Sequence, residues 1–355
     1  MDTIPVHPLR IVQVGLGDWG RDWAWRVNPQ VGEVAVVAYV DPDPAAFAGL
    51  RRHLDLDPTM CFRSMREALE ATHPDAALIT ATLAAHERLT RAALEAGLHV
   101  LVEKPFTDDL EQAIELVDLA GARGRVLMVS QNYRFFPAPR LAARLVRERT
   151  LGDLYSIGID FRRNSASPPK PRGRHHSDSQ PLLIDMSVHH FDLLRMILGR
   201  EPRSVSCQAP RQSWSGFDGP PAAIASVDFD DVLVSYRGSW VSAAPITPWA
   251  GEWRMEFEDG AVFWTSRGDD GVLSDRAVMR PRKGRGRVMA LPEVARIDRA
   301  GSLTEFAAAI RESREPECSG RDNLSTLAFM LAAVESSETG ETREVAVGQP
   351  VDIKA

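Results

Sequence analysis

Short apolar runs alternate with segments of helical spacing along the first third of the chain. The apolar runs are Ile11–Val14, Val34–Val40, AALIT (76–80) and HVLVE (99–103), and the segments with helical periodicity include 63–71 and 86–96. Continuously apolar strands are typical of parallel sheets that are covered on both faces. The alternation therefore predicts an α/β domain built on a doubly wound parallel sheet.

The pattern changes from Tyr155 onward, where apolar and polar residues alternate. This alternation occurs in YSIGIDF, AIASVDFD, VLVSYRGSW, EWRMEFEDG and AVFWTS, with turns such as Asp259-Gly260 between them. It predicts a meander of antiparallel strands in a second, α+β domain. We place the first domain at residues 1–129 and the second at 130–355, in keeping with a length of 355 residues.

Helices are expected to cover the second sheet. A helix from Leu182 to Leu198 is predicted on one face. The other face needs a second subunit, so we expect a homodimer or homotetramer. The late helices are expected to begin with a capping box at Ser302 and Glu305, to resume from Asp322, and to pack back on the first domain.

Composition narrows the classes of partner. The net charge is -7, from 42 basic and 49 acidic residues, which gives no general attraction to nucleic acid or anionic lipid. No run approaches the roughly 18 apolar residues of a membrane span. The 3 cysteines lie far apart, which argues against a disulfide framework and a zinc site. We expect a cytoplasmic protein with a small-molecule partner and no metal.

A glycine motif follows the first predicted strand. Gly15, Gly17 and Gly20 of GLGDWG fit the dinucleotide fingerprint, in which the glycines make the turn, admit the pyrophosphate and allow close packing. Asp41 ends the second strand, where an acid binds ribose hydroxyls and repels a 2′-phosphate. The motif predicts a Rossmann domain that prefers NAD(H) over NADP(H). Asp18 fits only if its side chain turns to solvent. The alternative is an ordinary strand-to-helix turn.

Polar residues follow two further strands of the predicted sheet. Thr80 and Thr82 follow one strand, and Glu103 and Lys104 follow the next. Ligands bind at the carboxyl ends of the strands in such sheets, so these residues are expected to face the cofactor. Pro105 fixes the backbone and directs Lys104. A structural Glu–Lys surface pair is the alternative.

These motifs together resemble the Gfo/Idh/MocA oxidoreductases, such as inositol 2-dehydrogenase and glucose-fructose oxidoreductase. The resemblance rests on GLGDWG, VDP, EKPF, QNYRFFP (131–137), DMSVHHFD (185–192) and SLTEFAAAIRESREP. It implies an NAD(P)-dependent dehydrogenase that acts on CH–OH groups of a sugar, cyclitol or related polyol. The cofactor-binding residues that we expect are Gly15, Gly17, Asp18, Trp19, Gly20, Asp41, Thr80, Thr82, His86, Glu103, Lys104 and Asn132.

The catalytic residues implied by the resemblance are Lys104, Asp185 and His189. The spacing of i and i+4 puts Asp185 and His189 on one face of the predicted helix. His189 would take the substrate proton, Asp185 would orient the imidazole or bind a substrate hydroxyl, and Lys104 would donate to the reacting oxygen. A packed, hydrogen-bonded histidine is the alternative for His189. His190 points elsewhere and is interpreted as structural.

The sequence departs from the family pattern at Leu83 and Ser187, so the substrate is not copied from a relative. The basic, proline-rich segment 162–180 is either a substrate lid that senses an acidic sugar or a solvated loop, and Arg163 is the substrate contact that we expect there. Two other functions stay open. One is a hydrolase or lyase that retains NAD and oxidises its substrate transiently, and the other is a dinucleotide-binding sensor without catalysis.

Overall fold

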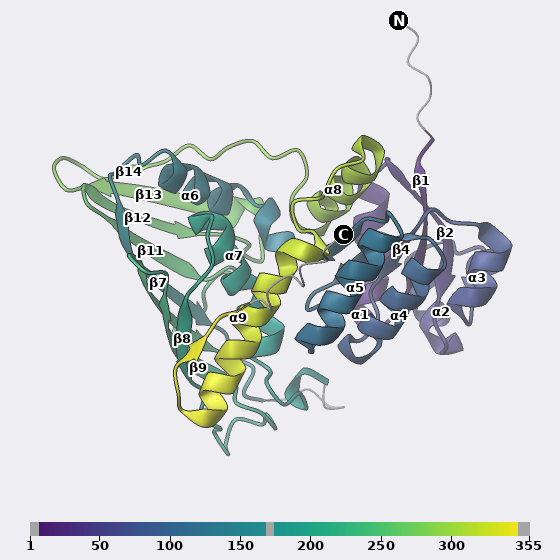
Figure 1. Cartoon of the computed structure of the whole chain (residues 1–355), viewed down its shortest axis with the longest axis horizontal. Helices are drawn as coiled ribbons and strands as arrows, with labels where there is room; N and C mark the ends of the chain where they lie inside the picture. Colours follow the sequence, from purple (N-terminus) through teal and green to yellow (C-terminus); the bar gives the residue numbers. More distant parts are fainter. Residues whose placement is uncertain (1–6, 168–173, 347–355) are drawn as a thin grey trace, which may run out of the picture. The chain divides into compact units, whose positions relative to one another are not determined.

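The chain folds into two compact units (Figure 1). The computed structural model describes residues 7–167 and 174–346. The first unit runs to Asn132 and also includes Arg296–Leu324, and the second unit holds Tyr133–Ala295 and continues from Ser325. This division differs from the predicted boundary after residue 129, since residues 130–132 and the segment 296–324 also lie in the first unit.

The first unit contains the predicted parallel sheet. Its six strands have the order β3-β2-β1-β4-β5-β6, and every neighbouring pair is parallel. The strands are β1 (Leu9–Val14), β2 (Val34–Val40), β3 (Cys61–Phe62), β4 (Ala76–Ile79), β5 (His99–Glu103) and β6 (Leu127–Ser130). The helices are α1 (Asp18–Asp22), α2 (Pro44–Leu50), α3 (Met65–Thr72), α4 (Leu83–Glu95), α5 (Leu110–Ala122) and α8 (Asp298–Glu312), and a π-helical turn, Trp23–Val27, continues α1.

Two helices of this unit begin before their predicted starts. Helix α4 begins at Leu83 instead of His86, because Thr82 already takes the extended N-cap conformation. Helix α8 begins at Asp298, and the N–H of Gly301 bonds the carbonyl of Ile297 at 3.1 Å. Ser302 therefore lies buried inside α8, and the capping box predicted there is wrong.

In the described part of the second unit, nine strands form one sheet of order β14-β13-β12-β11-β7-β10-β9-β8-β15. It is mostly antiparallel as predicted, but β7 pairs with β10 in parallel, so the strands do not form a simple meander. The long crossover from β7 through α7 makes this parallel pair possible. The strands are β7 (Leu154–Arg162), β8 (Ser204–Gln208), β9 (Ala222–Asp228), β10 (Leu233–Ser239), β11 (Glu252–Phe257), β12 (Gly260–Thr265), β13 (Arg276–Pro281), β14 (Arg287–Val288) and β15 (Arg343–Glu344).

Helices cover one face of this sheet. They are α6 (Pro137–Arg147), α7 (Val188–Leu198) and the part of α9 (Gly320–Thr339) that belongs to this unit. Phe191 of α7 stacks on Phe329 of α9 with ring centroids 4.1 Å apart. The opposite face leaves apolar side chains exposed, with Ile224 at 61% and Leu233 at 64%.

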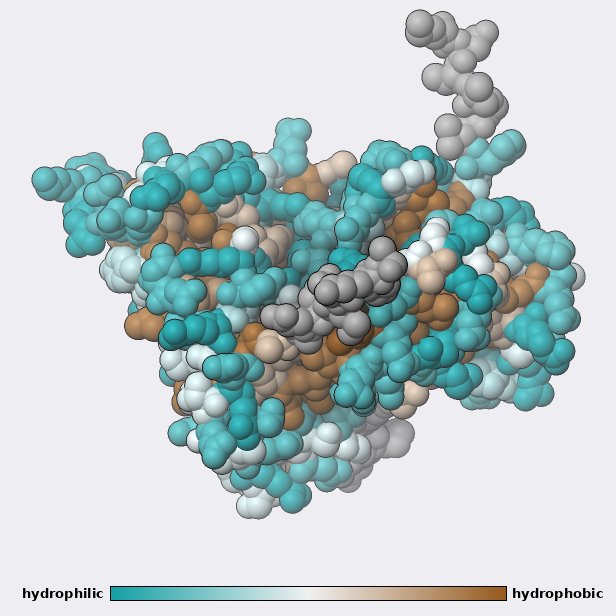
Figure 2. All heavy atoms as spheres, in the orientation of Figure 1, coloured by the Kyte–Doolittle hydropathy of each residue, from teal (hydrophilic) through white to brown (hydrophobic). Residues whose placement is uncertain are grey.

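Hydrophilic residues cover most of the face of each unit that Figure 2 shows, and hydrophobic residues are visible between them in patches. Among the helices in the described part of the chain, none has the length and apolar character needed to cross a membrane.

Candidate active site

The glycine loop after β1 has the shape of a pyrophosphate cradle. Gly15 has φ +98°, and a Cβ there would lie 2.5 Å from the backbone of Ala81. A Cβ on Gly20 would lie 2.0 Å from the carbonyl oxygen of Gly15. At Gly17, by contrast, a Cβ would meet no atom within 4 Å. The first and third glycines are therefore required by the fold itself, whereas the second faces open space, as close approach of a ligand requires.

Buried polar side chains support this loop from below. The Thr80 hydroxyl donates to the carbonyl of Gly15 at 2.7 Å, so this predicted cofactor residue fixes the turn. The amide of Gln13 donates to the carbonyl of Gly20 at 2.7 Å and to the Thr80 hydroxyl at 3.1 Å. Sequence reasoning missed Gln13, although its polar side chain in the apolar run Ile11–Val14 was a visible signal.

The two acidic residues predicted near the cofactor have opposite orientations. The side chain of Asp18 is fully exposed and pairs with Arg21, so it turns to solvent as required. Asp41 holds the loop, since its carboxylate accepts hydrogen bonds from the N–H of Leu16 at 2.7 Å and of Asp43 at 2.9 Å. A carboxylate has about four acceptor positions, so Asp41 keeps the capacity to bind ribose hydroxyls.

An arginine also lies close to Asp41. The guanidinium of Arg63 donates to the carbonyl of Pro42 at 3.0 Å. The residues directly after Asp41 supply no arginine, but the β2–β3 pairing brings Arg63 to this strand end from more than twenty residues along the chain. The electrostatic potential near Asp41 is therefore less negative than the residues next to it in the sequence indicate.

Glu103 is a buried anchor at the end of β5. Its carboxylate accepts a hydrogen bond from the indole of Trp23 at 2.7 Å and one from the backbone N–H of Lys104 at 3.2 Å. The carboxylate thus connects the end of β5 with the π-helical turn that follows the glycine loop. Lys104 is half-buried beside it, and the Lys104–Pro105 peptide is cis. The geometry argues against the exposed surface pair that was the alternative.

His86 is committed to the protein backbone. Its Nδ1 lies 2.8 Å from the carbonyl of Pro105 and its Nε2 lies 3.1 Å from that of Ala81. Burial lowers the pKa of His86, and the two carbonyls oppose that shift. A neutral imidazole donates from only one nitrogen, but both are occupied by these contacts. His86 thus ties α4 to the segment after β5, and its place at the cofactor stays a prediction.

The remaining predicted residues of the first unit occupy different surroundings. Thr82 is exposed at the start of α4. Asn132 is buried and its amide donates to the carboxylate of Asp298. Trp19 is 43% exposed in α1, with the guanidinium of Arg299 over its ring at 4.0 Å. Sequence reasoning missed Arg299, which lies on α8.

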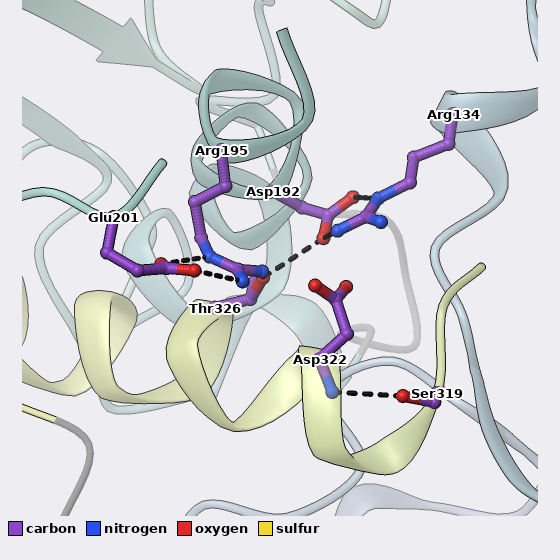
Figure 3. Close-up of polar contacts among 7 residues, drawn as sticks. All are labelled: Arg134, Asp192, Arg195, Glu201, Ser319, Asp322 and Thr326. Carbon is purple, nitrogen blue, oxygen red and sulfur yellow. Dashed lines mark hydrogen bonds and ion pairs between the residues drawn. The ribbon is translucent and has the colours of Figure 1, made fainter. Parts of the chain in front are cut away.

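In the second unit, the predicted base His189 is held by stacking. Its imidazole lies against the ring of Tyr133, with centroids 3.9 Å apart and 2° between the planes. The next residue, Arg134, makes a bidentate ion pair with Asp192 of α7 at 2.6 and 2.7 Å (Figure 3). Thr326 of α9 donates to the same carboxylate at 3.0 Å. The ring stack of Tyr133 and the ion pair of Arg134 thus join the segment 133–134 to the first turns of α7.

The predicted acid Asp185 lies in a widened turn. Residues Leu183–Ser187 form a π-helical turn before α7, and the N–H of Ser187 bonds the carbonyl of Leu182 at 2.8 Å. The i, i+4 geometry of a regular α-helix therefore does not apply between Asp185 and His189. Oδ2 of Asp185 lies 3.3 Å from Nδ1 of His175, a residue that sequence reasoning did not select.

His190 is structural, as interpreted. Its nitrogens lie 3.2 Å from the hydroxyl of Tyr236 and 3.1 Å from the carbonyl of Trp249. Burial lowers its pKa to about 4. Ser187 lies in the same buried cluster, with its hydroxyl 2.8 Å from that of Tyr236.

Arg163 lies in a cluster of charges and aromatic rings. Its guanidinium stacks over Trp249 at 3.9 Å and pairs with Asp269 at 3.5 Å. The indole of Trp249 also donates to Asp269 at 2.8 Å, and this bond together with the two arginines 163 and 267 lowers the pKa of Asp269. Arg267 in turn donates to the hydroxyl of Tyr133 at 3.1 Å. Residues 168–173 of the predicted lid lie outside the described residues.

Comparison with known proteins identifies two regions of the chain. Residues 9–131 match the family model described as "Oxidoreductase family, NAD-binding Rossmann fold", and residues 139–260 match the "GFO/IDH/MocA C-terminal domain". An inositol 2-dehydrogenase of Saccharopolyspora erythraea is 32% identical over 211 residues, which is 58% of each chain and thus less than two thirds of that enzyme. A D-apiose dehydrogenase of Paraburkholderia graminis is 24% identical over 97% of this chain and 91% of its own.

A solved structure shares the fold over nearly the whole chain. It is an oxidoreductase from Agrobacterium radiobacter in complex with NAD+, L-tartaric acid and magnesium, with a TM-score of 0.82 and 17% identity over 96% of this chain and 99% of that one. At this identity the match shows the fold alone.

Proposed function

Because the chain belongs to the Gfo/Idh/MocA oxidoreductase family, we propose that it is an NAD(H)-dependent dehydrogenase of a sugar, cyclitol or related polyol. The observation that carries this proposal is the open space at Gly17 between two glycines that the fold itself requires. A Cβ at Gly17 would extend into this space, and its absence lets a ligand approach the backbone closely.

The residues of the first unit fit a dinucleotide. We propose that the loop from Gly15 to Gly20, with the backbone of Asp18 and Trp19, holds the pyrophosphate. Asp41 would bind the ribose hydroxyls, which favours NAD(H), while Arg63 moderates the discrimination against a 2′-phosphate. Thr80, His86, Glu103 and Asn132 would act by fixing the backbone around this site, and Thr82 would contact the nicotinamide end.

The chemistry is assigned to three side chains. The bound nicotinamide supplies the hydride acceptor or donor. In the direction of oxidation, His189 takes the proton of the reacting hydroxyl, and its stacking on Tyr133 limits the rotation of the imidazole. Lys104 donates to the same oxygen and stabilises its developing negative charge. Asp185 accepts a hydrogen bond from a substrate hydroxyl and so orients the carbon that loses hydride.

The surroundings of Arg163 bear on the charge of the substrate. Its guanidinium already has Asp269 as a counterion, so little positive charge remains for a carboxylate. Its Nε is buried and has no hydrogen-bond partner in the described part of the chain. We therefore favour a neutral polyol over the acidic sugar.

A second copy of the chain is proposed as the partner of the exposed sheet face. Ile224 and Leu233 leave apolar surface on this face. A homodimer or homotetramer would cover it, and light scattering measures the mass directly. The cytoplasm is the proposed location, since the three cysteines are all free thiols.

The test of the proposed function is turnover. Purified protein is incubated with NAD and a panel of polyols, cyclitols, aldoses and uronic acids, and NADH is followed by its near-ultraviolet absorbance. Steady NADH formation that Lys104→Met and His189→Ala abolish would support the proposal. Product formation without NADH would favour a retained cofactor, and NAD binding without product would favour a sensor.

A further inference from the structure

The carboxylate of Asp185 has a partner in a turn that lies shortly before it in the chain. Its Oδ2 lies 3.3 Å from Nδ1 of His175, which belongs to a short 3-10 turn, Arg174–His176. The side chains are 29% and 45% exposed for His175 and Asp185, respectively, so the pair lies at the edge of open space. The segment that carries His175 is the one that the sequence left undecided between a lid and a loop.

Aromatic rings hold the imidazole of His175 in one orientation. It meets Trp240, Phe217 and His176 edge to face, with centroids 4.6, 5.2 and 5.5 Å away. His176 is itself fixed, because it stacks on Phe217 at 4.4 Å and its Nε2 lies 3.0 Å from the carbonyl of Ser165. Contacts on several sides restrict rotation of the ring, so Nδ1 stays directed at Asp185.

The surroundings of the two ring nitrogens indicate where the proton lies. A neutral imidazole donates from one nitrogen and accepts at the other. Nδ1 of His175 faces a carboxylate, whereas Nε2 is buried and has no hydrogen-bond partner in the described chain. A proton on Nε2 would be a buried donor without an acceptor, and Nδ1 would then face the carboxylate without a proton. A proton on Nδ1 avoids both costs, because it binds the carboxylate. The proton therefore belongs on Nδ1, where it binds Asp185.

Asp185 lies in the π-helical turn and is nearly half exposed. The contact with His175 therefore restrains its carboxylate at a position that is open to solvent. We propose that His175 is a positioning residue for Asp185. Its Nδ1–H holds one carboxylate oxygen, so that the other oxygen faces the substrate hydroxyl. This inference rests on the proposed function, since it assigns Asp185 to the substrate.

Two substitutions of His175 distinguish the contribution of its hydrogen bond from the contribution of its packing. The amide of an asparagine can place an N–H close to where Nδ1 of histidine lies, whereas leucine fills the space without a donor. We expect His175→Leu to lower kcat by about 10- to 100-fold, the range for a lost hydrogen bond to a charged group. His175→Asn should recover most of the loss, and the Kd for NADH should stay at the wild-type value in both variants, because the predicted cofactor residues lie in the first unit.

A neighbouring histidine supplies the matched control. His176→Leu disturbs the same turn and the same contact with Phe217, but it leaves His175 and Asp185 in place, so its loss of kcat should be smaller. Equal losses in His175→Leu, His175→Asn and His176→Leu would reduce the role of His175 to packing and overturn the proposal. Circular dichroism of each variant shows whether it folds.

A second measurement tests the pair without turnover. The tautomer of the His175 imidazole is identified by NMR of its ring nitrogens in the wild type and in Asp185→Asn. The pairing predicts that the proton lies on Nδ1 in the wild type and that this preference weakens when the carboxylate is lost. A wild type in which the proton lies on Nε2 would overturn the pairing. A wild type that reduces no NAD would contradict the proposed function and remove the role with it, whereas an active wild type matched by His175→Leu would overturn the role of His175 alone.

Discussion

The imidazole of His189 and the phenol ring of Tyr133 are stacked, with 3.9 Å between centroids and 2° between planes. An aromatic pair of this kind contributes about 0.5–1.5 kcal/mol beyond its buried area. We predict that Tyr133→Leu lowers kcat by up to about tenfold, since this energy then no longer holds the imidazole. Tyr133→Phe keeps the stack and should retain most of the rate. Equal rates in the two variants would show that stacking does not position His189.

The ion pair between Arg134 and Asp192 anchors the same region. Both side chains are almost fully buried, at 5% and 1% exposed. Removal of one partner leaves a buried charge without its counterion, so we predict that Arg134→Met lowers the free energy of unfolding by about 3–5 kcal/mol. The double variant Arg134→Met with Asp192→Leu should be more stable than the single variant. Urea denaturation measures both, and an unaffected single variant would contradict the assignment.

The glycine loop offers a contrast between folding and binding. Gly17→Ala adds a methyl group to open space, so we predict a wild-type melting temperature and a large loss of NADH affinity. Gly20→Ala places a Cβ 2.0 Å from the carbonyl oxygen of Gly15, so it should destabilise the protein itself. Thermal denaturation and fluorescence titration with NADH distinguish the two. A Gly17→Ala variant that binds NADH normally would contradict the cradle.

Local features of the sequence predicted what depends on local geometry. The parallel strands followed from apolar runs, and the loop from three glycines in one short segment. Gln13 and Arg299 were missed because each contacts residues far along the chain, Thr80 and Trp19 respectively. His175 was missed because its segment has no apolar periodicity that predicts the turn facing Asp185. The π-helical turn before α7 was also missed, since the apolar spacing of residues 182–198 fits a regular α-helix equally well.

Asp41 is expected to set the preference between the two cofactors. We predict that Asp41→Ala weakens NADH binding by about tenfold or more, through the lost ribose contacts and the lost bond to the N–H of Leu16. NADPH should gain relative to NADH, because the repulsion of the 2′-phosphate is removed. Adding Arg63→Ala should weaken NADPH binding specifically. An unchanged ratio of the two Kd values in Asp41→Ala would contradict this account.

Buried His190 makes stability depend on pH. Burial lowers its pKa to about 4 in the folded state, whereas the unfolded chain binds the proton near the ordinary value of 6.5. The unfolded state therefore holds more protons between these values, and stability falls as the pH drops through this window. Relative to His190→Gln, the wild type should lose about 2 kcal/mol between about pH 7 and pH 5. Urea denaturation at both pH values checks this, and parallel losses in the two proteins would contradict it.

The central claim is hydride transfer between substrate and nicotinamide, in which His189 takes the proton and Lys104 stabilises the reacting oxygen. The most direct test uses a polyol that the protein oxidises, deuterated at the reacting carbon. After the reaction, the recovered cofactor is examined by mass spectrometry. The account predicts deuterium in the released NADH, and no transfer in Lys104→Met or His189→Ala. Product that forms while the released cofactor stays unlabelled, or transfer that survives both substitutions, would contradict it.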